Sequence, residues 1–95
     1  MSRAFTIRAA ATLARAGVSV AALAPAGCFD AAMLVLSNRV PGAGSKVAIE
    51  MFHAAGLEAE EIWPMVHAAA RMHGLREVTV EEVQRLCDKL DNDIQ

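Results

Sequence analysis

The spacing of glycine and proline constrains this chain more than any other feature of its sequence. Residues 16–18 read Ala-Gly-Val and precede Pro25, and 39 positions later residues 55–57 read Ala-Gly-Leu and precede Pro64. A glycine after an amphipathic stretch ends a helix, and a proline is tolerated in the first turn of the next one. The pattern therefore predicts two copies of a helix–glycine–helix unit, although abundant alanine could also produce such a recurrence by accident. The same spacing relates four further pairs: Leu13 and Phe52, Ala31 and Ala70, Met33 and Met72, and Leu36 and Leu75.

Apolar residues recur at helical spacing through most of the chain, and no stretch sustains the alternation of a strand. We therefore expect one all-α domain over residues 1–95, built as a small bundle of about five helices. The repeated units would occupy residues 4–38 and 45–74. The individual helices are expected over residues 4–16, 26–38, 46–55, 57–73 and 79–91.

Short polar residues predict where several of these helices begin. Ser2 or Arg3 is expected near the start of the first helix, and Ser45 is expected to cap the third. Thr79 and Glu82 have the spacing of a capping box, in which each side chain bonds the backbone of the other residue. The last helix should therefore begin next to Thr79.

The second helix is expected to be the most buried, because residues 26–38 are apolar almost all round. The sequence allows two starting points for this helix, because Pro25 either lies in its first turn or kinks a helix that has already begun at Val20. In the last helix, Asp91 and Asp93 oppose the helix dipole, so we expect the tail to fray. The core stripe of that helix is expected to be Val80, Val83, Cys87 and Leu90.

Composition indicates a partner. Hydrophobic residues make up 55% of 95 residues, and so small a chain cannot bury every large apolar side chain. A contiguous apolar surface usually marks an interface, so we expect self-association or another protein partner. Trp63 is open to two interpretations, core filler or interface anchor. The candidate contact surface is Met51, Phe52, Trp63, Met65 and Met72.

Charge is divided unevenly along the chain. Residues 1–46 carry five basic side chains and one acidic one, a net charge of +4, whereas residues 47–95 carry four basic and ten acidic ones, a net charge of −6. Halves of opposite sign could attract each other within one chain or between protomers, and solvated faces explain them equally well.

A local helix-turn-helix pattern provides a second functional hypothesis. Residues 69–84 place Ala70 four positions before Gly74, with an aliphatic residue after the glycine and Val83 nine positions beyond it. These are positions at which two crossing helices touch. Residues 13–24 contain a second local match, which resembles the turn of lactose-repressor-type regulators. The resemblance implies a small dimeric DNA-binding regulator.

The charges near this segment oppose DNA binding. The candidate DNA contacts are Arg8, Arg15, Arg76 and Arg85. Glu77, Glu81 and Glu82 would face the same groove, where they would repel the phosphates. An α-helical corner used only for packing explains the segment as well.

No set of residues predicts catalysis, a metal site or a cofactor. His67 and His73 are six positions apart and do not share a helix face, so we expect the histidines to lie at the solvent edge. Cys28 is expected to be a small buried apolar residue rather than a reactive thiol. Residues 41–46 resemble a phosphate loop but lack its spacing and its preceding strand.

The expected function is therefore a non-enzymatic interaction or adaptor module, with the DNA-binding regulator as the alternative. The two cysteines form no recognisable disulfide framework, which fits a reducing cytosol. Residues 1–28 could alternatively be a lipoprotein export signal ending at Cys28, although Pro25 and Arg15 interrupt its apolar stretch. No apolar run approaches the length of a membrane span.

Overall fold

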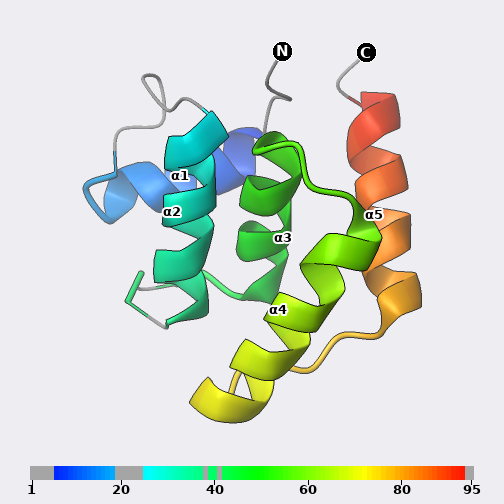
Figure 1. The fold of residues 1–95 in the computed structure, drawn as a ribbon. Helices are drawn as coiled ribbons and strands as arrows, with labels where there is room; N and C mark the ends of the chain where they lie inside the picture. Colours follow the sequence, from blue (N-terminus) through cyan, green and yellow to red (C-terminus); the bar gives the residue numbers. More distant parts are fainter. Residues whose placement is uncertain (1–5, 19–24, 38, 41, 94–95) are drawn as a thin grey trace.

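The computed structural model describes residues 6–18, 25–37, 39–40 and 42–93 of the chain (Figure 1). Within these residues the fold is all-α, as the sequence predicts, and contains no strand. Its five helices are α1 (Ile7–Arg15), α2 (Pro25–Leu36), α3 (Ser45–Ala54), α4 (Ala59–His73) and α5 (Val80–Asp93).

Helix α3 lies at the centre of the bundle. It packs against α2 on one side and against α4 and α5 on the other (Figure 1). Eight of its ten residues are buried, including the charged Glu50. The prediction that the second helix is the most buried is wrong, because Met33 and Leu34 of α2 are each 43% exposed. Helix α3 is covered on several sides despite its polar residues, since burial depends on the number of packed neighbours as well as on composition.

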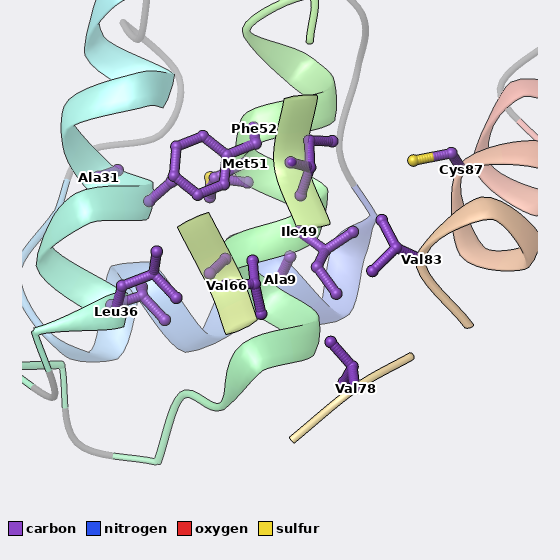
Figure 2. Close-up of a cluster of buried hydrophobic side chains, with 14 of the residues drawn as sticks. Ala9, Ala31, Leu36, Ile49, Met51, Phe52, Val66, Val78, Val83 and Cys87 are labelled. Carbon is purple, nitrogen blue, oxygen red and sulfur yellow. The ribbon is translucent and has the colours of Figure 1, made fainter. Parts of the chain in front are cut away.

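The core joins all five helices. Side chains from α1, α2, α3, α4 and α5 converge in Figure 2, together with Val78 from the connection between α4 and α5. Phe29 of α2 meets Phe52 of α3 edge to face, with ring centroids 5.3 Å apart. This arrangement is the favoured geometry for an aromatic pair. The core side chains labelled in Figure 2 are Ala9, Ala31, Leu36, Ile49, Met51, Phe52, Val66, Val78, Val83 and Cys87.

The two repeated glycine turns share one backbone geometry. Gly17 has φ +85° and Gly56 has φ +98°, both in the left-handed region. The residue after each glycine donates its N–H to a carbonyl five positions earlier, at 3.0 Å in the first turn and 3.1 Å in the second. This bond is the mark of the Schellman motif. The prolines are not equivalent, however, because Pro25 begins α2 whereas Pro64 lies inside α4.

The structure confirms some of the predicted helix caps and corrects others. Thr6 caps α1 by accepting the N–H of Ala9, so this helix begins at Ile7 rather than near Ser2 or Arg3, which lie outside the described residues. Ser45 is the first residue of α3 and not its cap. Its hydroxyl instead donates to the Arg76 carbonyl at 3.3 Å, because a tertiary partner is within reach.

The start of α5 was predicted correctly. The Thr79 N–H donates to the Glu82 carboxylate at 3.2 Å, and the Glu82 N–H donates to the Thr79 hydroxyl at 3.1 Å. These two bonds form the expected capping box.

The prediction that Val80 belongs to the core stripe of α5 is wrong. Val80 is 43% exposed, because Val78 occupies that part of the core. Near the end of the helix, Asp91 accepts a hydrogen bond from His53 of α3 at 2.7 Å. Helix α5 continues to Asp93, and residues 94–95 lie outside the described residues, so fraying of the tail stays a prediction.

The lengths of the helices also bear on membranes. Among the described residues, every helix is too short or too polar to cross a bilayer.

Candidate interaction surface

A shallow groove runs between α2 and α4 on the outside of the bundle. Its volume is about 230 Å³. Met72 is 76% exposed, Met33 is 43% exposed and Met65 is half-buried. The hydroxyl of Ser37 donates to the Met33 carbonyl at 2.9 Å, so this polar group is already satisfied. We call this feature the methionine groove, and it is lined by Met33, Leu36, Ser37, Met65, Ala68, Ala69, Met72 and His73.

Helical periodicity explains why the two α4 methionines share one face. Met65 and Met72 are seven residues apart, which returns to within about 20° around an α-helix. The buried face of α4 contains Ile62 and Val66. The methionines flank that face, so they reach the edge of the core and remain partly in solvent.

The predicted contact surface is corrected for two of its five residues. Met51 and Phe52 are both 0% exposed and belong to the core. They lie on α3, whose position between α2, α4 and α5 leaves no outer face for them. A sequence shows which residues are apolar but not which helix the others will surround.

Trp63 lies on another side of α4. It is nine residues from Met72, about 180° around the helix, and is half-buried. Its indole N–H donates to the Val78 carbonyl at 3.0 Å, and its ring stacks on His67 with centroids 4.8 Å apart. Trp63 therefore holds the α4–α5 connection against α4, and only Met65 and Met72 of the predicted set lie in the groove.

A larger cavity of about 500 Å³ lies between the start of α3, the α4–α5 connection and α5. Several of its polar groups already bond one another. Ser45 donates to the Arg76 carbonyl, and the Arg76 guanidinium pairs with Glu82 at 2.8 Å. The same pairing, with the Thr79 N–H, lowers the pKa of Glu82. These contacts tie the start of α3 and the start of α5 to the α4–α5 connection.

The four candidate DNA contacts do not come from one element. Arg8 and Arg15 are exposed on α1, and Arg85 is exposed on α5. Arg76 lies in the α4–α5 connection and is engaged by Glu82. That connection spans residues 74–79, whereas the turn of a helix-turn-helix has three or four residues. The second local match extends into residues 19–24, outside the described part of the chain.

The histidines and cysteines have structural environments. His53 is 1% exposed, so the expectation of a solvent-edge histidine is wrong for this residue. Cys28 and Cys87 are buried and form no disulfide, and burial raises the pKa of the Cys28 thiol, as expected for an unreactive cysteine. Within the described ranges, no three His, Cys, Asp or Glu side chains are grouped so that they could hold a metal ion.

Met33 and Leu36 are the groove residues that the sequence interpretation assigned elsewhere. Both belong to a stripe of α2 that was expected to face the core, and Leu36 does so while Met33 remains exposed. The sequence feature that could have predicted the exposure of Met33 is that α2 is apolar on almost every side. Such a helix leaves part of its apolar surface uncovered unless neighbours surround it.

Comparisons with known proteins identify no relative. No protein-family model matches the chain, and no curated protein or solved structure matches it either.

Proposed function

We propose that this protein acts without catalysis, as an interaction or regulatory adaptor module, and that the methionine groove is its contact surface. The observation that carries this proposal is the convergence of Met33, Met65 and Met72 from two helices at one partly exposed site. Methionine side chains are flexible and polarisable, so they adapt to the apolar surface of a partner.

The size and composition of the groove favour a protein partner. Its volume of about 230 Å³ is below the range of roughly 300–1,000 Å³ that is usual for small-molecule sites. An apolar groove between two helices instead suits the apolar side chains of a docked helix. Self-association is included in the proposal, because a second copy is one such partner.

We place this activity in the cytoplasm. The support is that the two cysteines are buried and form no disulfide in the structure. Buried cysteines outside a disulfide fit a reducing compartment.

The DNA-binding regulator remains the alternative. Burial of Ala70 and Val83 supports it, because these are two of the positions at which the crossing helices of the motif touch. The six-residue connection and the pairing of Arg76 with Glu82 weigh against it. Tight, salt-sensitive retention on duplex DNA would favour the regulator over the adaptor.

A comparative capture experiment tests the groove. Tagged wild-type protein, Met72→Glu and Val80→Glu are each incubated with extract of the native host. Val80→Glu is the matched control, because Val80 is also an exposed apolar residue but begins α5, away from the groove. At least one protein should be retained by the wild type and the control and lost from Met72→Glu. If all three tagged proteins retain the same set of host proteins, the proposal is contradicted.

A further inference from the structure

Helix α1 has an apolar outer face that the rest of the described chain leaves uncovered. Ile7 is 89% exposed, the largest exposed fraction among the large hydrophobic side chains that the structure describes. Ala11 and Ala14 follow it at helical spacing and are exposed as well. Arg8 and Arg15 are exposed along one flank of this stripe. The outer face of α1 is therefore apolar with a basic border.

The inner face of α1 fixes the direction of the outer one. Ala9 and Leu13 are 0% exposed and belong to the core. Ile7 lies about 160° around the helix from Ala9 if each residue advances 100°. The outer face consequently points away from the rest of the described chain.

Acidic side chains lie beside the start of the methionine groove, and the basic Arg71 lies beside its end. Asp30 precedes Met33 by three residues on α2, and Glu61 precedes Met65 by four residues on α4. Residues three or four apart are neighbours on a helix surface, so both carboxylates lie beside the groove, one turn before its methionines. Both residues are exposed.

We infer that the methionine groove binds helix α1 of a second copy of this chain. Ile7 enters the groove between the methionines of α2 and α4, and the arginines of α1 face Asp30 and Glu61. The inference rests on the proposed function, because it names the occupant of the same groove. Two positive charges meet two negative ones, which sets the orientation of the docked helix. Orientations that bring charges of the same sign together are disfavoured.

Each copy offers one α1 face and one groove, and these surfaces lie on different elements. A pair of copies related by a two-fold axis fills both grooves at once, which closes the assembly as a dimer.

Sedimentation equilibrium over a wide concentration range tests the docking. The wild type should dimerise reversibly, and Ile7→Ser should raise the dissociation constant at least about tenfold, because burying an isoleucine side chain is worth more than that factor. Val80→Ser is the control and should leave the constant unchanged. Ile7 is exposed, so both variants should keep the helical circular dichroism of the wild type. A wild type that stays monomeric at every concentration would overturn the inference.

Charge exchange between two variants tests the orientation. One variant carries Arg8→Glu with Arg15→Glu, and the other carries Asp30→Lys with Glu61→Gln. Glutamine is chosen at position 61 because Glu61 accepts the Glu58 N–H at the start of α4, and a glutamine can do the same. Each variant alone should associate more weakly than the wild type, and an equimolar mixture should recover association. A mixture no stronger than either variant alone would overturn the inference.

The outcomes separate the inference from the proposed function. A monomeric wild type whose host partner is lost on Met72→Glu defeats self-docking and leaves the adaptor function intact. If the Ile7→Ser and Met72→Glu variants each dimerise as well as the wild type, the groove is not the site of self-docking. Both proposals are defeated if the wild type stays monomeric and retains no host protein that Met72→Glu loses.

Discussion

His53 ties two helices together through one buried polar contact. Its side chain is 1% exposed, and its Nε2 lies 2.7 Å from a carboxylate oxygen of Asp91, which is 48% exposed. Because an ionised carboxylate can only accept, Nε2 carries the proton. The other ring nitrogen, Nδ1, is buried and has no hydrogen-bond partner among the described residues. Asp91 is therefore the group that compensates for burying this histidine.

Removing the Asp91 carboxylate should destabilise the fold. Asp91→Ala leaves the buried Nε2–H of His53 without its partner, which costs about 1–3 kcal/mol in the free energy of unfolding. Asp88→Ala is the control, since Asp88 accepts a hydrogen bond from the exposed Gln84 side chain, and it should change stability by less than about 0.5 kcal/mol. Urea denaturation measures both. Equal effects of the two variants would contradict the role of Asp91.

Glu82 should make stability depend on pH in the acid range. Its pKa is lowered by the Arg76 guanidinium and by the Thr79 N–H. A lowered pKa in the folded state means that the carboxylate adds stability above its ordinary pKa of about 4.3 and loses it as pH falls through the folded value. Glu82→Gln should therefore be less stable than the wild type at neutral pH, and the difference should disappear in strong acid. A difference independent of pH, measured by urea denaturation, would contradict this account.

At the scale of the element, local sequence predicts helix ends better than helix surroundings. The glycine stops and the Thr79–Glu82 capping box were predicted correctly, because each depends on backbone atoms a few residues away. Ser45 was assigned wrongly as a cap, because its partner is the distant Arg76 carbonyl. The burial of α3 and the exposure of Val80 were missed for the same reason, since both depend on which helices become neighbours.

The two glycine turns should respond alike to substitution. Gly17 and Gly56 have positive φ angles, and no atom lies within 4 Å of where a Cβ would stand. Alanine at either position should cost about 1–2 kcal/mol from backbone strain alone. Gly44→Ser is the control, because Gly44 has extended backbone and open space around it, and serine can cap the helix there. It should leave thermal unfolding unchanged or raise its midpoint.

Pro64 should weaken its own helix. It lies in the interior of α4 and is exposed, so its missing N–H removes one helical bond without a tertiary contact that requires it. Pro64→Ala should raise the free energy of unfolding by up to about 3 kcal/mol. Pro25→Ala should instead lower it slightly, because Pro25 is the first residue of α2, where proline is favoured. Destabilisation by Pro64→Ala in urea would show that the proline has a role beyond the helix.

At the scale of the whole molecule, the predicted contact surface divides into three places. Met51 and Phe52 are in the core, Trp63 packs on the α4–α5 connection, and Met65 and Met72 lie in the groove. Composition correctly indicated that some large apolar side chains would remain exposed, but it could not identify Met33 as the partner from α2. That pairing arises because α2 and α4 both pack on α3 and also meet each other.

Methionine methyl NMR tests most directly whether the methionine groove is the contact surface. The protein is labelled at its methionine methyl groups and compared when dilute in buffer, when concentrated in buffer, and when dilute in extract of the native host. Met51 is 0% exposed and serves as an internal control. We expect the Met33, Met65 and Met72 methyl resonances to shift in the concentrated sample, the extract or both, while that of Met51 stays in place. Groove methyl resonances that remain unmoved in all three samples would contradict the account.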